Sequence, residues 1–491
     1  MTAMTPSSLS PVMTRDTAIA LGNAILEMLP ENTWMVTIDQ IVRAVTTVAN
    51  GAVLSNDDGT TLILRFNGQF RNGMPVTIGT NVLDDSTLRR VVTNALALAP
   101  SHPGRERPLD PDDEVYFGDN QKEYLPVSLW HERTIAAMGI ARETAIPGLV
   151  DQVREARLMA SATIGFAARA SCYVSRLGLS AYSRETDCEV TVTARTTDGT
   201  ASGWGGAASR DWADINLQTI ASHATEIANK SRHCSAFEPG RYVTILSAAA
   251  VAQLVRQMAP VFDANFADQG LGAFGIPDRD IQQHFVKHNK IGMQVFDPRV
   301  VMISDPADPE GGFPPFFEVG GNGFAGHPIP AVTWVDHGIL RNLAYASGYA
   351  LFCGKTACEQ PFSVRVTTVP GTPTATIDEM IANCERGIYV NRLSDVRLVD
   401  AKTGMMTGVT RDGCFFVKNG KIDRPIKNLR FTDSPFFAFN KLEMVGIPVR
   451  AAFGYNARPV LRDSHRWPRL PVIVPPMMIQ DFNFTALVDA V

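Results

Sequence analysis

The stretch from Cys384 to Asp433 constrains the fold more than any other part of the sequence. It contains short runs of β-branched and aromatic residues, at 388–390, 414–417 and 426–431. Such runs are typical of strands. Between them lie two turn sequences in which Gly and Asn reach positive φ at little cost, Lys402-Thr403-Gly404 and Lys418-Asn419-Gly420. The stretch therefore predicts an antiparallel β-meander.

The order of these motifs resembles the C-terminal signature of the TldD/PmbA family, in which PmbA is also called TldE. A glycine-led strand from Gly387, a Thr403-Gly404 turn, an Asn419-Gly420 hairpin and a final strand follow one another as in the family. Upstream, the run from Gly323 to Leu340 resembles another family segment, and the resemblance extends from about Arg241 to Gly446. Members pair as a catalytic metallopeptidase subunit with a non-catalytic sister, so the resemblance implies one of these two roles.

The composition is that of an ordinary globular protein. The chain has 491 residues, enough for two or three domains, of which 45% are apolar and 19% charged. A net charge of −5 provides no general basic surface for nucleic acid. No apolar run approaches the roughly 20 residues of a membrane span, and the N-terminus lacks a signal-peptide pattern, so we expect a cytoplasmic protein. The seven cysteines are scattered and odd in number, which indicates free thiols rather than a disulfide framework.

The first half of the chain predicts an α+β domain with a curved antiparallel sheet. The order helix, strands, helix occurs twice, with helices expected at 15–29, 87–98, 129–145 and 211–230. Asn67-Gly68 is typical of a turn. We predict a disordered lead at 1–14, an N-terminal α+β domain at 15–238, and a boundary at Glu238-Pro239-Gly240.

The second domain, at 241–491, is predicted to be mainly antiparallel β. Its first strand is expected at 242–246, and Ser247 is expected to cap an apolar helix from Ala248 to Met258. Strands and Pro/Gly turns dominate the rest. The tail from Pro468 to Pro476 carries four prolines and is expected to lie over the surface.

The resemblance also bears on catalysis. In catalytic members, the helix after this first strand carries His-Glu-x-x-x-His, and a cysteine nearer the C-terminus completes the zinc site. These positions correspond to Arg256, Gln257 and Val261 here. Arg stays protonated and Val has no donor atom, so neither binds zinc. No histidine lies in this helix and no cysteine follows Cys414. The resemblance therefore implies a TldE-type subunit without catalytic residues or metal ligands, with zinc in a TldD-like partner.

Two further groups of residues are candidate sites. His284 and His288 have the i,i+4 spacing of a metal-binding pair, although the run is more typical of a solvated, polar helix end. The glycine-rich, aromatic loop from Glu310 to His327 corresponds to a family region beside the cavity that receives an extended peptide. Glu318 and His327 are our candidates for substrate binding. The alternative is a loop that packs its own aromatic side chains.

We expect the non-catalytic subunit of a heterodimeric TldD/TldE zinc metallopeptidase, which completes a cavity for extended peptides or peptide-like amides. Such substrates belong to ribosomal peptide maturation, proteolysis or a biosynthetic pathway. The alternatives are a stand-alone, divergent amide-cleaving or biosynthetic enzyme and a homodimeric peptide-binding protein. The sequence identifies neither the substrate nor the partner.

Overall fold

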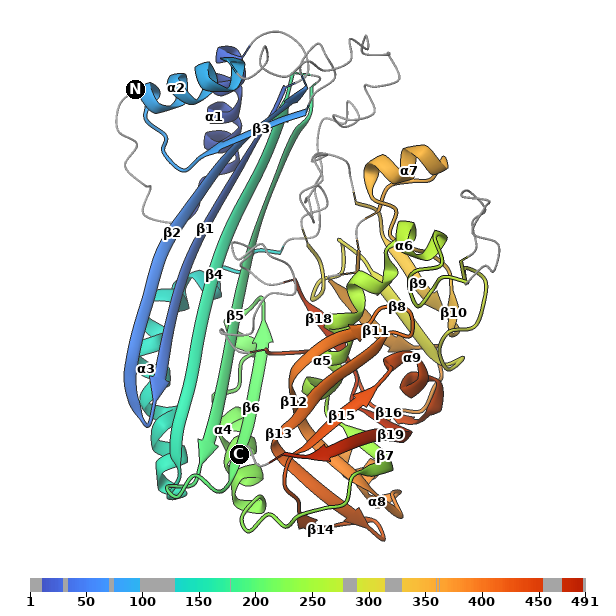
Figure 1. Cartoon of the computed structure of the whole chain (residues 1–491). Coiled ribbons are helices and arrows are strands. Elements are labelled where there is room, and N and C mark those ends of the chain that lie inside the picture. The colour runs from blue at the N-terminus through green and yellow to red at the C-terminus, as the bar shows by residue number, and fades with distance from the viewer. Residues whose placement is uncertain are drawn as a thin grey trace.

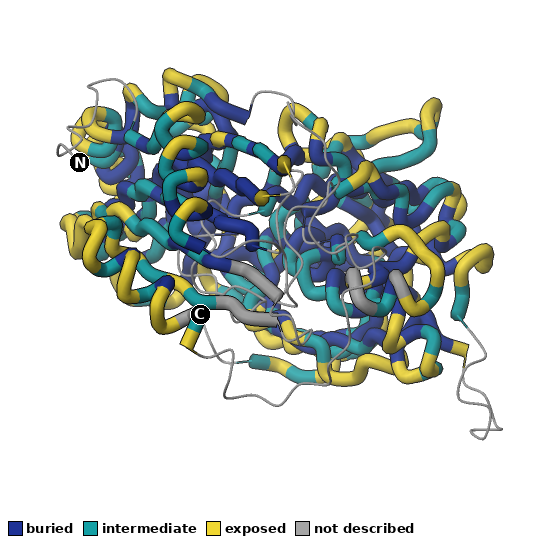
Figure 2. Tube along the Cα trace, turned by 90° about the horizontal axis from the view of Figure 1, so that it is seen from above, coloured by how far each residue is buried: buried dark blue, intermediate teal, exposed yellow. Residues whose placement is uncertain are grey.

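A computed structural model describes residues 11–29, 34–69, 75–97, 129–176, 178–276, 289–313, 329–358, 360–361, 363–453 and 470–488. A long, curved sheet stands beside a strand-rich C-terminal body (Figure 1). Buried residues fill the inside of both parts, and exposed residues lie at the periphery (Figure 2). The predicted α+β class is confirmed, since helices accompany sheets of mainly antiparallel strands.

The first sheet has six strands in the order β3-β2-β1-β4-β5-β6, and all its pairings are antiparallel. The strands are β1 (Trp34–Ala49), β2 (Ala52–Gln69), β3 (Pro75–Thr80), β4 (Met159–Ser175), β5 (Ser180–Arg195) and β6 (Ser202–Ser209). The accompanying helices are α1 (Arg15–Met28), α2 (Asp85–Ala97), α3 (Glu132–Glu155), η3 (Trp212–Asp214) and α4 (Leu217–Lys230). A tight turn joins β1 to β2 at Asn50-Gly51, where φ is 51° and 78°.

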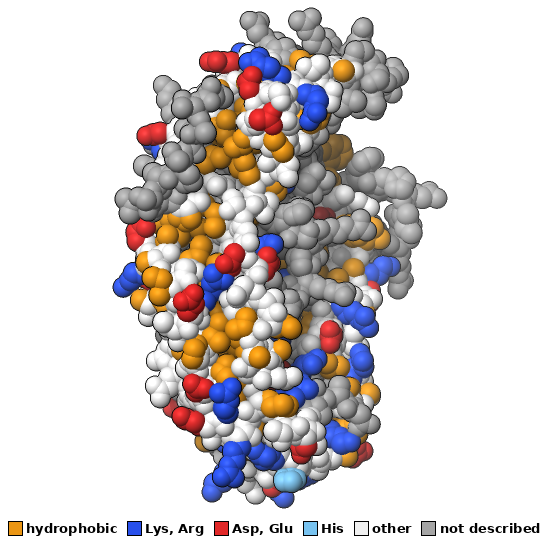
Figure 3. Space-filling model, turned by 90° about the vertical axis from the view of Figure 1, so that its left-hand side faces the viewer, with side chains coloured by type: hydrophobic (Ala, Val, Ile, Leu, Met, Phe, Trp, Pro, Cys, Tyr) orange, Lys and Arg blue, Asp and Glu red, His pale blue; other side chains and the backbone are white. Residues whose placement is uncertain are grey.

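Alternate residues of β4 and β5 point to opposite faces of this sheet. Even-numbered residues form what we call the helix face, where Phe166, Cys188 and Val190 belong to a core shared with α3 and α4. Odd-numbered residues form the inner face, which includes the buried charged side chains of Arg169 and Glu185. Helix α3 lies on the side of the sheet away from the C-terminal body (Figure 1). The outer side of this domain carries apolar side chains interspersed with charged ones (Figure 3).

Two further sheets make up the C-terminal body in the described residues. One has the order β10-β9-β8-β11-β18-β17, and the other has the order β12-β7-β19-β15-β13-β14 with β16 paired to β19. The strands are β7 (Gly240–Leu246), β8 (Val300–Ser304), β9 (Val332–Asp336), β10 (Ile339–Leu340), β11 (Val364–Thr368), β12 (Arg386–Asp400), β13 (Met405–Lys418), β14 (Lys421–Pro425), β15 (Leu429–Asp433), β16 (Leu442–Val445), β17 (Val449–Arg450), β18 (Val472–Val474) and β19 (Met477–Leu487). The helices are α5 (Ala248–Met258), η4 (Ala259–Phe262), α6 (Ala264–Asp268), α7 (Ser347–Cys353), α8 (Ile377–Ala382), α9 (Pro435–Ala438) and η5 (Phe439–Lys441). One hydrophobic core includes residues of both sheets and of α5.

The strands divide at the start of β7. Those before Gly240 form the first sheet and those from Gly240 onward form the other two, and we keep Glu238-Pro239-Gly240 as the proposed domain boundary. Residues 1–10 of the proposed lead lie outside the described residues. Val12 is buried and the backbone N–H of Met13 donates to Gln40 Oε1 (2.6 Å), so the chain just before α1 contacts the first sheet.

The predicted β-meander is confirmed for β12, β13 and β14, which pair antiparallel in sequence order. Its turns contain Gly404, Asn419 and Gly420, all at positive φ as expected. Strand β13 is long enough to pair with both β14 and β15, and β15 also pairs with β19. The meander is therefore part of a larger sheet.

One local prediction before Gly240 was wrong, and one predicted helix was confirmed with different ends. Asn67-Gly68 is not a turn but lies within β2, opposite Thr77 and Val76, because β3 adds to this edge of the sheet. The helix predicted at 129–145 is α3, which begins at Glu132 and continues past Pro147 to Glu155. Burial of the apolar side chains beyond Pro147 offsets the hydrogen bond that a helical proline removes.

The predicted surface position of the C-terminal tail was also wrong. Val472 to Val474 form β18, which pairs with β11 and β17, and their side chains are fully buried. The prolines on either side mark the two ends of this short strand, and they do not prevent its burial in the core. All seven cysteines are free, as expected. Among the described residues, no helix combines the length and apolar character needed to cross a membrane.

Candidate functional site

Helix α5 begins and ends where the sequence predicts. The Ser247 hydroxyl accepts a hydrogen bond from the Ala250 backbone N–H (3.2 Å), which caps the first turn. The α-helix ends at Met258, and the 3-10 helix η4 follows with Pro260 near its start. Positions 256 and 261 therefore do not lie on one continuous α-helix.

The residues at the implied zinc positions are engaged in packing. The guanidinium carbon of Arg256 lies 4.9 Å from the ring centroid of Phe453, in cation–π geometry. Val261 is buried in the C-terminal core. Neither side chain offers an electron pair to a metal, so these positions do not fit zinc.

Other predicted site residues lie outside the described part of the chain. They are Glu318, His327, His284 and His288. Among the residues that the structure does describe, no three His, Cys, Asp or Glu side chains are grouped so that they could hold a metal ion. The first two residues remain our candidates for substrate binding.

Charged side chains on the inner face hold the segment that leads toward Glu318. The Arg210 guanidinium donates through Nη1 to Glu185 Oε2 (2.9 Å) and to the Thr186 carbonyl (3.2 Å). Its Nη2 donates to the carbonyl of Gly312, which belongs to the C-terminal body. Arg210 and Glu185 are both buried, so this guanidinium joins the first sheet to the C-terminal body away from water.

A second contact between the first sheet and the C-terminal body lies two residues further along β5. Arg450 Nη2 in β17 donates to Asp187 Oδ1, and both side chains are buried. The backbone N–H of Phe453 then donates to Glu189 Oε2 (2.9 Å). Phe453 therefore links the inner face to the end of α5, because its ring also faces Arg256.

The inner face continues onto the neighbouring strands. Arg169 in β4 makes a bidentate pair with Asp39 in β1, with N···O distances of 2.7 and 2.8 Å. Ser171 Oγ donates to the same carboxylate (2.9 Å), and Arg169 Nη1 lies 3.7 Å from Glu185 Oε1. We call these side chains and those of Asp187, Glu189, Arg210 and Arg450 the inner charge network.

Burial controls the electrostatics of this network. It raises the pKa of Asp187 to about 6, although Arg450 and Arg210 oppose the shift. Loss of hydration also lowers the pKa of Arg210, an effect that the Glu185 carboxylate counters. The thiol of Cys188 points to the helix face, where burial raises its pKa, so it is not an available nucleophile. The network is therefore suited to holding chain segments in place.

This network was not predicted from the sequence. Its members lie between Asp39 and Arg450, and no local motif connects them. One signal was available: polar residues occupy every second position from Ser183 to Glu189, and the last three of these positions are acidic. Four such positions in one strand place four polar side chains on the same face of the sheet. When other parts of the protein cover both faces of the sheet, such a pattern indicates a buried polar face instead of a solvent-exposed one.

Comparisons with known proteins identify relatives of this fold. A sequence profile described as "PmbA/TldA metallopeptidase C-terminal domain" matches residues 239–486. No curated protein sequence matches the chain significantly. Among solved structures, TldE from Thermococcus kodakarensis is similar with a TM-score of 0.73 and 11% identity, over 95% of this chain and 99% of that one.

Two proteins described as proposed modulators of DNA gyrase are similar as well. The one from Thermotoga maritima has a TM-score of 0.72 and 15% identity, over 95% of this chain and 99% of that one. The one from Bacteroides thetaiotaomicron has a TM-score of 0.71 and 15% identity, over 96% of this chain and 98% of that one. At these identities the likeness establishes the fold alone.

Proposed function

The chain belongs to the TldD/PmbA family, and from this premise we propose that it is the non-catalytic, TldE-like subunit of a heterodimeric zinc metallopeptidase. The zinc ion and the catalytic residues belong to a TldD-like partner. This chain completes the cavity that receives extended peptides or peptide-like amides, in the cytoplasm.

One observation carries the proposal. Helix α5 follows β7 as the family's zinc helix follows its strand, yet Arg256 and Val261 occupy the ligand positions. Arg256 is held over Phe453, and Val261 is part of the core. The scaffold of the site is thus retained without its metal-binding side chains, as expected of a sister subunit.

The inner charge network supports a role in shaping the cavity. Its side chains form hydrogen bonds with the backbone of Gly312, which precedes Glu318 by six residues. They also accept a hydrogen bond from the backbone of Phe453, which lies three residues after β17. Extended peptides expose backbone N–H and C=O groups that need polar partners. We therefore propose that the loop after Gly312 presents Glu318 and His327 to the substrate.

The test is native mass spectrometry with metal analysis, on the chain alone and after co-expression with a TldD-like protein. We expect a metal-free chain alone, and a one-to-one complex that contains zinc only with the partner. A zinc-containing homodimer that ignores the partner would overturn the proposal. Turnover of a peptide amide by the pure chain after exhaustive chelation would instead establish a stand-alone enzyme.

The substrate-binding residues have a separate test in the complex. Glu318→Gln and His327→Ala should raise KM for an extended peptide and leave the zinc content unchanged. Glu226→Gln is the matched control, because this exposed carboxylate pairs with Lys230 on α4 (2.5 Å), outside the candidate loop. If all three variants have the same KM as the parent complex, Glu318 and His327 do not contact the substrate.

A further inference from the structure

The first sheet has one long open edge among the described residues. Strand β3 pairs with β2 only at Leu64–Gln69. From Ala52 to Ile63, β2 therefore has β1 on one side and no described strand on the other. This part of β2 forms the rim of the sheet on the side away from the C-terminal body (Figure 1). Alternate residues of such an edge direct backbone N–H and C=O groups outward, where another strand can pair with them.

The acidic side chains of this edge are held in ion pairs within the chain. Charged side chains commonly protect natural edge strands from pairing with other chains. Here Asp57 pairs with Arg43 of β1 (3.2 Å) on the inner face. On the helix face, Asp58 accepts a hydrogen bond from Arg142 Nη2 of α3 (2.7 Å). Both carboxylates are thus drawn over the sheet of their own chain, so the usual charge protection of an edge is weakened.

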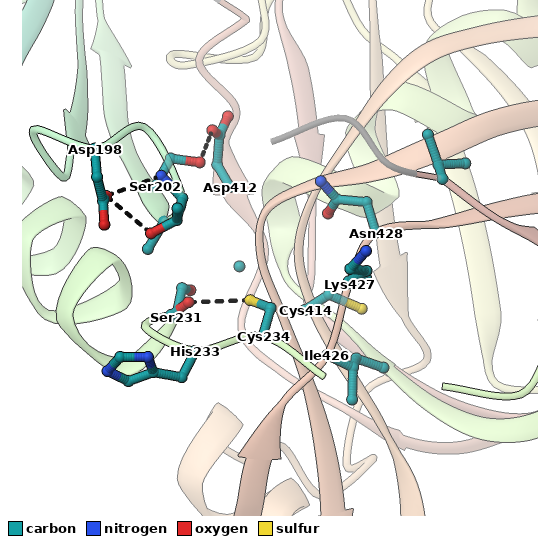
Figure 4. Close-up of a pocket in the computed structure, with 14 residues that line it drawn as sticks. Asp198, Ser202, Ser231, His233, Cys234, Asp412, Cys414, Ile426, Lys427 and Asn428 are labelled. Atoms are coloured by element: carbon teal, nitrogen blue, oxygen red, sulfur yellow. Dashed lines mark hydrogen bonds between the residues drawn. The ribbon is translucent and has the colours of Figure 1, made fainter. Parts of the chain in front are cut away.

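The edge differs in this respect from the pocket between the first sheet and the C-terminal body, which has a volume of about 390 Å³. In that pocket the Asp412 carboxylate accepts a hydrogen bond from Ser202 Oγ (2.8 Å) (Figure 4). The same carboxylate pairs with Arg392 (3.0 Å). The pocket's carboxylate at this position is already engaged, whereas the open edge of β2 keeps a strand-pairing surface.

The charges of β2 restrict how a second copy of the chain can pair with it. A two-fold axis through an antiparallel edge makes one residue face its own counterpart. An axis at Asp57 or at Asp58 would place two carboxylates directly opposite each other, which is destabilising. With the axis at Gly59, Asp57 faces Thr61 of the other copy instead. Asp58 then faces Thr60, so a hydroxyl donor lies opposite each carboxylate.

The length of the open edge supports the same axis. Centred on Gly59, the pairing extends from Ser55 to Ile63 and stops where β3 begins to occupy the edge. An axis at Asn56 would pair an equally long segment, but it would place Asp58 opposite the apolar side chain of Leu54. The axis at Gly59 is therefore the favoured one.

We propose that two copies of this chain join through β2, antiparallel about a two-fold axis at Gly59, so that their first sheets form one continuous sheet. Backbone hydrogen bonds on both sides of the axis hold the copies together. Val53 and Leu54, which are 54% and 71% exposed, then lie in each copy beside the end of β3 in the other. The exposed side chain of Val82 follows that end, so apolar contacts extend the interface.

The pairing is expected to be weak, because a single strand edge buries little area. A dissociation constant of about 10–100 µM is typical of so small an interface. The inference does not depend on the proposed function, since this rim lies on the opposite side of the first sheet from the C-terminal body that contains α5 (Figure 1). A heterodimer and this pairing can therefore coexist.

The first experiment is sedimentation velocity of the full chain between about 1 and 300 µM, where we expect a shift from monomer to dimer. Thr60→Asp places a carboxylate opposite Asp58 of the other copy, twice in each dimer, and should weaken the dimer about tenfold. Thr60→Lys places an opposite charge there and should leave the dimer as strong or stronger. Thr219→Asp, at an exposed position of α4, is the matched control and should behave as the parent chain. A chain that stays monomeric, or a dimer weakened equally by both Thr60 variants, would overturn the proposal.

A disulfide cross-link tests the position of the axis. A Cβ at Gly59 would meet only Arg43 Nε, at 3.9 Å, so a side chain fits there. Directly opposed residues of paired strands bring their Cβ atoms close to the distance that a disulfide needs. Oxidised glutathione, which accepts the two electrons, should link two copies of Gly59→Cys but neither the parent chain nor Gly139→Cys on α3. A Gly59→Cys dimer that does not cross-link would contradict the proposed axis.

Hydrogen exchange distinguishes a second copy from another segment of the same chain. Outward amides between Ser55 and Ile63 should exchange rapidly at about 1 µM and become protected at about 300 µM. Equal protection at both concentrations would mean that the chain covers this edge itself, and the proposal would be wrong.

Discussion

The helix face and the inner face of the first sheet are built from alternate residues of the same strands, yet the helix face is mainly apolar and the inner face carries buried charged side chains. On the helix face, Phe166 and Val190 are fully buried against apolar helices. On the inner face, Glu185 and Asp187 are almost as well buried, but as ionisable groups paired with arginines. Residues of similar burial therefore form apolar packing contacts on one face of the sheet and ion pairs on the other.

The two faces of the sheet contribute differently to the structure. Apolar burial is non-directional, so the helix face stabilises the domain but specifies little about its neighbours. Buried ion pairs contribute little net stability, because desolvation offsets their attraction, yet they tolerate only one arrangement of partners. The inner face therefore fixes the position of the C-terminal body on the sheet.

The largest expected effect comes from emptying the helix face. Phe166→Ala removes a ring that is fully buried and that lies 4.9 Å from the ring of Trp212. We expect a loss of about 4 kcal/mol in the free energy of unfolding, from lost transfer energy and the cavity left behind. Urea denaturation followed by circular dichroism measures this change. A loss below about 1 kcal/mol would mean that the helix face is loosely packed.

Breaking one pair of the inner face should have a somewhat smaller effect. Arg450→Met leaves the Asp187 carboxylate buried without its main cationic partner, and we expect a loss of about 3 kcal/mol near pH 8. The double variant Arg450→Met with Asp187→Leu should recover most of this loss, because no buried charge remains. If the double variant is no more stable than Arg450→Met, charge burial is not the cause.

The inner face should also respond to pH, whereas the helix face should not. The folded pKa of Asp187, about 6, exceeds its unfolded value of 3.8, so the folded state binds the proton more tightly. This contribution to stability is fully present below the unfolded pKa and is lost as the pH rises through about 6. Relative to Asp187→Asn, the parent chain should lose about 2 kcal/mol between about pH 4.5 and about pH 6.5.

Denaturant titrations of both proteins across this pH range test the assignment. Phe166→Ala serves as a control, because its stability should follow that of the parent chain at a constant offset. A parallel pH dependence for Asp187→Asn and the parent would show that another group carries the titration.

The smallest expected effect belongs to an exposed ion pair. Arg89 and Asp85 in α2 form an i,i+4 pair with an N···O distance of 2.8 Å, but both side chains are more than half exposed. Arg89→Met should therefore leave the melting temperature unchanged within error. A clear decrease would mean that burial is not what distinguishes the inner charge network from other ion pairs.

Local sequence signals were sufficient for part of this structure. Ser247 and the apolar residues after it predicted α5, and Lys418-Asn419-Gly420 predicted the turn from β13 to β14, because caps and tight turns depend on neighbouring residues. The absence of zinc-binding side chains at Arg256 and Val261 was likewise readable from the sequence, through the family resemblance.

The errors and omissions have a common physical cause in long-range packing. Asn67-Gly68 became strand because β3 pairs with it, and β18 is buried because β11 and β17 flank it. The inner charge network was missed for the same reason, since Asp187 and Arg450 are 263 residues apart. Strand pairing, burial and ion pairs of this kind depend on tertiary contacts, which cannot be derived from the local pattern of a single sequence.

The pairing of β1 with β4 has a consequence for how the chain folds. Asp39 and Ser171 are adjacent in the sheet but 132 residues apart in the chain. During synthesis the β1–β2 hairpin leaves the ribosome long before β4. Until β4 is synthesised, β1 lacks its neighbouring strand and the apolar side chains of the hairpin remain exposed. Contacts over such separations slow folding and prolong exposure to aggregation. We expect nascent chains that end before Ser175 to depend on chaperones far more than the completed protein does.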